Sequence, residues 1–122
     1  MAENKIILEK ANAAISAGDY EGFLVHCTDN TEWIFTGDTV LHGKEAVREW
    51  MRNTYLEPPK FMVENMVAEG DFVIAIGKID LKGEDGTNVQ HSYCDVWRFT
   101  NGKIAGLEAF VIKSKPGKSS LS

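Results

Sequence analysis

The residue whose surroundings best suit chemistry is Asp95, in an apolar run near the C-terminus. Residues 89–99 are rich in β-branched and aromatic side chains, which predicts a strand. Side chains alternate between the two faces of a strand, so one face of this one carries His91, Tyr93, Asp95, Trp97 and Phe99. Because a carboxyl group among apolar neighbours is costly to ionise, we expect the Asp95 carboxyl to have a raised pKa and to stay protonated.

A protonated Asp95 carboxyl could donate a hydrogen bond or a proton to a carbonyl or enolate oxygen, which makes Asp95 the candidate catalytic residue. The alternative is a structural aspartate whose carboxyl group is satisfied by a neighbouring Tyr or Trp donor. We favour the functional interpretation because strongly desolvated carboxyl groups concentrate at functional sites.

A proton-transfer partner for Asp95 is not visible from spacing alone. His91 shares its predicted face but lies four residues along the strand, roughly 13 Å away at about 3.3 Å per residue, so the two cannot hydrogen-bond directly. Lys78 could pair with Asp95 if it faced inward. Either strand parity is tenable there, and a solvated lysine is the favoured alternative because unpaired lysines are almost never buried.

Aromatic residues supply most of the other candidate ligand contacts. Tyr93 and Trp33 could line a pocket and donate hydrogen bonds, with Phe35 and Trp97 as further ligand-binding candidates. The alternative for all four is a structural place in the core. His26 could act at the pocket mouth, and the alternative there is a solvent-exposed histidine near the C-terminus of a helix.

Two helices are predicted at the N-terminus. Apolar residues recur at helical spacing over 7–15, and Gly18 follows where a glycine commonly ends a helix. Asp19 is a suitable N-cap for a short second helix that runs to about Cys27. The two helices should form a hairpin.

A strand pair and a third helix follow. Residues 31–36 are rich in β-branched and aromatic types and precede Gly37, which predicts a strand, and 39–41 could pair back on it. Apolar residues fall on one helical face from 44 to about 55, and the prolines at 58 and 59 prevent any continuation.

The second half of the sequence predicts an antiparallel meander. Its strands are expected at 61–68, 72–81, 89–99 and 103–112. The last two are joined by Asn101-Gly102, and Asn-Gly between apolar runs is the strongest short hairpin signal. We therefore predict one α+β domain over residues 1–113 and a flexible tail over 114–122.

Composition excludes several partners and sites. The 122 residues carry a net charge of −5 with a pI near 5.1 and no basic cluster, which disfavours nucleic acid and anionic membranes. Neither a signal peptide nor a membrane-spanning segment is expected, so we predict a cytoplasmic protein. Cys27 and Cys94 are expected to be free thiols, and we expect no metal and no cofactor.

Three segments resemble the nuclear-transport-factor-2-like superfamily: 17–23, Leu41-His42-Gly43 and 93–104. Within it the chain is most similar to the SnoaL-like (polyketide-cyclase-like) and ketosteroid-isomerase-like groups. The resemblance implies a cone-shaped half-barrel, with three N-terminal helices packed in the concave face of a curved, mainly antiparallel sheet. It also implies a pocket between sheet and helices and, often, a homodimer.

Asp95-Val96-Trp97-Arg98-Phe99 resembles the isomerase motif in which the aspartate is a neutral acid of the oxyanion hole. The other parts of that machinery are missing. The position of the catalytic base falls on Phe35, and those of the oxyanion-hole tyrosine and the two supporting tyrosines fall on Ala11, Cys27 and Met51. The histidine expected in cyclase-like relatives, near 78–81, is also absent. Steroid isomerisation by that mechanism is therefore rejected.

Two kinds of function remain open. The first is a lyase, isomerase or cyclase that acts on a small hydrophobic carbonyl compound through a neutral Asp95. The alternative is a non-catalytic domain that binds a small ligand or associates as a homodimer through the outer sheet face. Glu108 and Phe110 are expected on that outer face because they alternate with Leu107, Ala109 and Val111, which the resemblance places inward.

Overall fold

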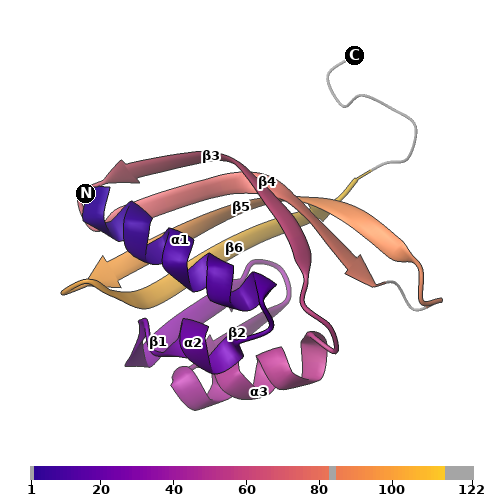
Figure 1. The fold of residues 1–122 in the computed structure, drawn as a ribbon, viewed down its shortest axis with the longest axis horizontal. Coiled ribbons are helices and arrows are strands. Elements are labelled where there is room, and N and C mark those ends of the chain that lie inside the picture. Colours follow the sequence, from indigo (N-terminus) through magenta and orange to yellow (C-terminus); the bar gives the residue numbers. More distant parts are fainter. Residues whose placement is uncertain (1, 83–84, 115–122) are drawn as a thin grey trace.

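The computed structural model describes residues 2–82 and 85–114. Three helices precede or interrupt the first strands, and a run of long strands completes the chain (Figure 1). In chain order the elements are α1 (Ala2–Ser16), α2 (Tyr20–Leu24), β1 (Cys27–Phe35), β2 (Thr39–His42), α3 (Lys44–Thr54), β3 (Lys60–Glu69), β4 (Phe72–Lys82), β5 (Asn88–Thr100) and β6 (Lys103–Lys113).

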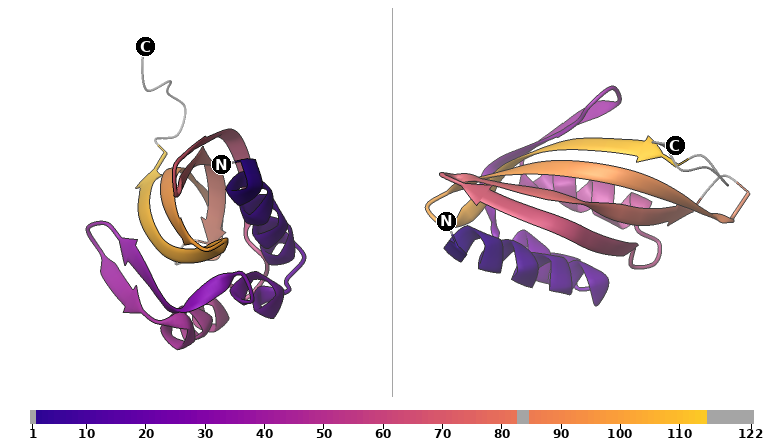
Figure 2. Two further views of the ribbon diagram at one scale, coloured as in Figure 1. Left: turned by 90° about the vertical axis from the view of Figure 1, so that its left-hand side faces the viewer. Right: turned by 90° about the horizontal axis from the view of Figure 1, so that it is seen from above.

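The strands form one six-stranded sheet in the order β2-β1-β6-β5-β4-β3. All neighbouring pairs are antiparallel except β1 and β6, which run parallel. Figure 2 shows that the sheet is strongly curved and does not close on itself. The predicted α+β class and the predicted meander are confirmed. The conical shape and the seating of the helices in its concave face stay predictions.

The turn between α1 and α2 has the predicted chemistry. Gly18 takes a positive φ of 79°, a conformation that L side chains rarely adopt. The Asp19 carboxylate caps α2 by accepting a hydrogen bond of 2.9 Å from the backbone N–H of Gly22. The local sequence therefore fixes the change of direction between the two helices.

The predicted end of the second helix near Cys27 is wrong. Helix α2 ends at Leu24, and Cys27 is already the first residue of β1. The His26 carbonyl accepts a hydrogen bond of 2.7 Å from the backbone N–H of Ile104, and Cys27 pairs with Ile104. Pairing with the distant strand β6 therefore takes these residues away from the helix.

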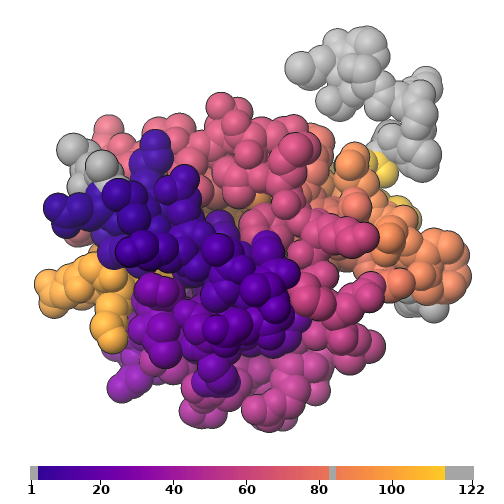
Figure 3. All heavy atoms as spheres, viewed as in Figure 1, coloured from indigo at the N-terminus to yellow at the C-terminus, as the bar shows by residue number. Residues whose placement is uncertain are grey.

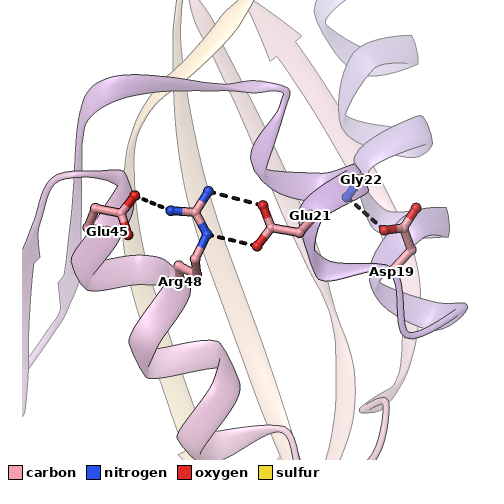
Figure 4. A network of polar contacts seen from close by, with 5 residues as sticks. All are labelled: Asp19, Glu21, Gly22, Glu45 and Arg48. Atoms are coloured by element: carbon pink, nitrogen blue, oxygen red, sulfur yellow. Dashed lines mark hydrogen bonds and ion pairs between the residues drawn. The ribbon is translucent and has the colours of Figure 1, made fainter.

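Arg48 joins helices α2 and α3 at the surface. Its Nε and Nη2 groups donate to the two carboxylate oxygens of Glu21, at 2.7 and 3.0 Å, and Nη1 contacts Glu45 on its own helix (Figure 4). A planar guanidinium group matches a carboxylate in this two-point manner. The contact lowers the pKa of the Glu21 carboxyl, chiefly through the hydrogen bond from Arg48.

The helices and the sheet share one hydrophobic cluster. Helix α1 contacts β3 and β4, and α3 contacts β1 and β2. On the face shown in Figure 3, the atoms of the helices and of β3 leave β5 and β6 visible mainly at their ends. The buried helical members of the cluster are Leu8, Ala11, Ile15, Phe23, Leu24, Val47 and Met51.

The predicted tail over 114–122 lies almost entirely outside the described residues. Ser114 is the exception, and its backbone N–H donates a hydrogen bond of 3.0 Å to the Gln90 carbonyl. Within the two described ranges, no helix is both long enough and apolar enough to cross a membrane.

Candidate functional site

Strand β5 presents His91, Tyr93, Asp95 and Trp97 to a cavity of about 340 Å³. Residues of all three helices and of β1, β3, β4 and β6 complete its lining, and most of them are apolar or aromatic. The strand alternation predicted from the sequence is therefore correct. A volume of this size lies at the lower end of the range for small-molecule sites.

Asp95 lies on the part of the cavity wall where the neighbouring side chains are smallest. Its cross-strand neighbours are Ala75 on β4 and Ala109 on β6, and both line the cavity. Along its own strand the inward neighbours are the large rings of Tyr93 and Trp97. The two alanines leave space beside the carboxyl group that longer side chains would fill.

The Asp95 carboxyl group is buried on one side and open on the other. Its Oδ1 atom is covered, with no hydrogen-bond partner in the part of the chain that the structure describes. The residue as a whole keeps some surface and lines the cavity. Burial raises the pKa of the Asp95 carboxyl to about 7. Because burial disfavours the ionised form, the neutral acid dominates below that pH.

Two tyrosines lie within electrostatic reach of Asp95. Burial, and then the charge of ionised Asp95, raise the pKa of Tyr93 to about 12, and the same causes in the same order raise the pKa of Tyr55. Both hydroxyl groups therefore keep their protons at neutral pH. Each can donate a hydrogen bond to a ligand in the cavity.

The position of the Tyr93 hydroxyl depends on Gly77, which has no side chain. Gly77 pairs with Tyr93 across β4 and β5. A Cβ atom at Gly77 would lie 2.8 Å from the Tyr93 hydroxyl and 2.0 Å from the Met62 carbonyl oxygen. Only glycine leaves room for both groups here.

An aromatic cluster forms another part of the cavity wall. The Trp33 ring meets Trp97 edge-on at a centroid distance of 5.6 Å, and Phe35 stacks on Trp50 at 4.8 Å. Trp33 Nε1 is buried and has no hydrogen-bond partner among residues 2–82 and 85–114. The cavity wall thus holds a second polar atom that the described protein groups leave unsatisfied.

His91 has a defined orientation at the other end of the inward face of β5. Its Nδ1 atom lies 3.0 Å from the Val89 carbonyl oxygen. A carbonyl oxygen can only accept, so Nδ1 carries the proton of this hydrogen bond. In the neutral imidazole, Nε2 is then an acceptor.

Five of the six residues predicted for the site line the cavity: Asp95, Tyr93, Trp33, Phe35 and Trp97. His26 does not line it. It follows α2 and its backbone bonds to Ile104 of β6, so the structure does not bring it to the predicted mouth. The roles assigned to the other five stay predictions.

The structure defines the orientation of Lys78, which the sequence left open, and of Glu108 and Phe110, which the sequence predicted. Lys78 Nζ donates to Ser92 Oγ at 3.1 Å and lies 3.9 Å from Glu64, so it faces outward and does not pair with Asp95. Glu108 and Phe110 are exposed while Leu107 and Ala109 line the cavity, as the alternation on β6 predicted.

Tyr55, Trp50 and Asp38 are among the cavity residues that were missed from the sequence. Tyr55 follows the last residue of α3, and its ring packs against Trp50 at 5.2 Å and Tyr20 at 5.7 Å. Trp50 lies in α3, and the apolar face predicted for this helix could have suggested a cavity wall. Asp38 lies in the turn between β1 and β2 and carries an exposed carboxylate.

A metal site finds no support in the described residues, where no three His, Cys, Asp or Glu side chains lie close enough to hold an ion. Cys27 is a buried free thiol, and burial raises its pKa to about 12. It therefore stays protonated, whereas a metal ligand or nucleophile would need the thiolate.

Comparison with known proteins agrees with this architecture. No curated protein matches the sequence. Solved structures of similar fold include an NTF2-like protein of unknown function from Burkholderia pseudomallei K96243, with 18% identity and a TM-score of 0.81 over 90% of this chain and 91% of that chain. Bal32a, from a soil-derived mobile gene cassette, has 19% identity and a TM-score of 0.81 over 90% and 89%.

A third similar structure is TerC co-crystallised with polyporic acid, with 19% identity and a TM-score of 0.77 over 88% of this chain and 90% of that chain. At these identities the three structures show the fold. The family model of the SnoaL-like domain matches residues 8–107, which is most of the sequence. The chain therefore belongs to the SnoaL-like family and has the fold of NTF2-like proteins.

Proposed function

We propose that this SnoaL-like protein binds a small hydrophobic carbonyl compound and acts on it as a lyase, isomerase or cyclase, with Asp95 as a neutral acid. One observation carries the proposal. The Asp95 carboxyl group has no protein partner at its covered oxygen among the described residues, and it opens on its other side to an apolar cavity. An unsatisfied buried acid is costly to retain unless a ligand uses it.

The chemistry follows from the charge that develops on the ligand. As a proton leaves the carbon next to a carbonyl group, negative charge accumulates on the carbonyl oxygen. A neutral Asp95 donates a hydrogen bond to that oxygen, and apolar walls strengthen the bond by excluding water. In this proposal the hydroxyl groups of Tyr55 and Tyr93 are further hydrogen-bond donors to the ligand.

The reaction also needs a base. Phe35, at the position where isomerase-like relatives carry it, lines the cavity but cannot accept a proton. The exposed Asp38 carboxylate, which also lines the cavity, can accept one. In the enzymatic form of the proposal Asp38 removes the proton. TerC, of the same fold, was crystallised with a small molecule, polyporic acid, which supports small-molecule binding.

Hydrogen exchange next to a ketone tests this proposal without knowledge of the substrate. 2-Acetylnaphthalene is incubated with the protein in heavy water, and loss of its methyl proton signal is followed by NMR. We expect the native protein to accelerate deuterium uptake and Asp95→Asn to lose the acceleration. Glu108→Gln, which changes an exposed outward carboxylate in the same way, should keep it.

The alternative is a non-catalytic binding protein. It is favoured by Phe35, which stands where isomerase-like relatives carry the catalytic base. In that case 2-acetylnaphthalene binds in the cavity and Asp95→Asn weakens it, but no deuterium is taken up above the uncatalysed rate. A native protein that neither binds the ketone nor exchanges its protons would remove both forms of the proposal.

The homodimer is proposed through the outer sheet face. Ile76, Cys94 and Phe110 are cross-strand neighbours there, and Ile76 and Phe110 are exposed. A row of apolar side chains across adjacent strands is typical of a surface that pairs with another. Sedimentation velocity should give a dimer for the native protein and a monomer for Phe110→Lys. A native protein that is monomeric at micromolar concentration contradicts this part.

A further inference from the structure

The inward face of β5 carries polar groups at two separate places. Asp95 lies at one, and His91, four residues earlier, lies at the other. Four residues of a strand span roughly 13 Å between Cα atoms. Tyr93 lies between them, with Val111 beside it on β6, whereas His91 has Ile79 beside it on β4 and Lys113 beside it on β6. Ile79 and Val111 line the cavity. Apart from the Tyr93 hydroxyl, the wall between the two places is therefore apolar.

The two polar groups have opposite hydrogen-bonding roles. Neutral Asp95 offers a donor. His91 offers an acceptor, because its Nδ1–H is already used by the Val89 carbonyl oxygen at 3.0 Å, which leaves the lone pair of Nε2. A ligand carboxylate would find no donor on neutral His91. A ligand hydroxyl group can donate to it.

We propose that His91 is a specificity-determining residue that accepts a hydrogen bond from a hydroxyl group at the far end of the ligand. The ligand is then a hydroxy carbonyl compound whose two oxygens lie at opposite ends of a rigid apolar body. This inference rests on the proposed function, because Asp95 must bind the carbonyl end. A single six-membered ring is too short to reach both groups.

Three naphthalene probes separate the two ends by calorimetric titration. 6-Acetyl-2-naphthol carries both oxygens, 2-acetylnaphthalene carries only the carbonyl group and 2-naphthol only the hydroxyl. The titrations are run at about pH 7, the midpoint of Asp95, where about half of the protein holds the neutral acid. We expect the native protein to bind 6-acetyl-2-naphthol about three- to tenfold more tightly than 2-acetylnaphthalene, the usual contribution of one hydrogen bond.

His91→Phe should abolish this preference and leave the affinity for 2-acetylnaphthalene unchanged, whereas His91→Gln, which keeps an acceptor, should retain part of it. His26→Phe is the matched control, because His26 is also half-buried but does not line the cavity. It should behave as the native protein. Circular dichroism confirms that each variant is folded.

The outcomes distinguish this inference from the proposed function. If Asp95→Asn weakens both ketones but the native protein shows no preference for the hydroxylated one, the role of His91 is wrong and the role of Asp95 stands. If His91→Phe keeps the preference, the hydroxyl group is bound elsewhere and the inference is also wrong. If neither ketone binds, both proposals fail.

Discussion

The two faces of β5 differ in whether their polar side chains find hydrogen-bond partners within the protein. Outward, Ser92 accepts a hydrogen bond from Lys78 at 3.1 Å, and the Arg98 guanidinium donates to the Ala105 carbonyl at 3.4 Å. Inward, Oδ1 of Asp95 is covered and meets no donor among the described residues. The outward groups are satisfied by the fold, whereas the inward carboxyl group is left for something the fold does not contain.

The largest expected effect concerns the pH dependence of stability. Unfolded, Asp95 ionises near 3.8, and folded near 7. Between these values the folded state holds a proton that the unfolded state has lost, so stability falls as pH rises, by up to about 1.4 kcal/mol per unit. Urea unfolding of the native protein relative to Asp95→Asn should show a total loss on the order of 4 kcal/mol, complete above about pH 7.

Glu108→Gln controls for the loss of a carboxyl group, because Glu108 is exposed on the outward face. It should keep the pH dependence of the native protein. A stability difference between the native protein and Asp95→Asn that is constant over this pH range would show that the carboxyl group titrates normally and that the two faces do not differ.

The next largest effect is on ligand affinity. Ala109→Val adds two methyl groups beside Asp95, in the space that the small side chain leaves open. We expect calorimetry to show at least about a tenfold loss of 2-acetylnaphthalene affinity, or about 1.4 kcal/mol. Cys94→Val also enlarges a side chain, but on the outward face of β5, and should leave the affinity unchanged. Equal affinities for both variants would place the ligand away from Asp95.

A smaller effect is expected at Thr31, whose unsatisfied polar group lies outside the cavity, in contrast to that of Asp95. The Thr31 hydroxyl is fully buried without a partner in the described residues, and Thr31 does not line the cavity. Thr31→Val should therefore leave stability unchanged or raise it by up to about 1 kcal/mol, since no hydrogen bond is lost. Thermal unfolding measures this change. A clear destabilisation would reveal a partner for the hydroxyl group.

The smallest effect is expected from the outward charges. Lys78→Met removes the contacts of Lys78 with Ser92 and Glu64, which are partly exposed, and should cost less than about 1 kcal/mol, with a weaker effect in high salt. The Asp95 carboxyl resonance, followed by NMR, should keep its titration midpoint. A shifted midpoint would mean that Lys78 acts on the cavity after all.

Local patterns predicted the part of the site that β5 supplies. Alternation along 89–99 placed Asp95 inward, and the predicted Asn101-Gly102 turn joins β5 to β6 with both residues at positive φ. These features depend on neighbouring residues in the sequence. They follow from strand geometry and turn chemistry alone.

Local sequence patterns could not predict the position of residues that depend on contacts with distant parts of the chain. Tyr55 enters the cavity because its ring packs on Tyr20 and Trp50, and nothing in the adjacent prolines indicates that direction. His26 was expected at the pocket mouth, but β1 begins early enough to place its backbone against Ile104. The position of His26 is set by the pairing of β1 with β6, and that of Tyr55 by contacts with two helices, so both depend on segments far apart in the sequence.

That parallel pairing also has a consequence for the order in which the site is made. Phe35 lies beside Ala109, and Ala109 lies beside Asp95, so the row that holds the acid joins early and late parts of the chain. Contacts of such wide separation form slowly because a long loop must close first. During synthesis on the ribosome, we expect β1 and β2 to wait for β6, so that the cavity is the last part of the protein to mature.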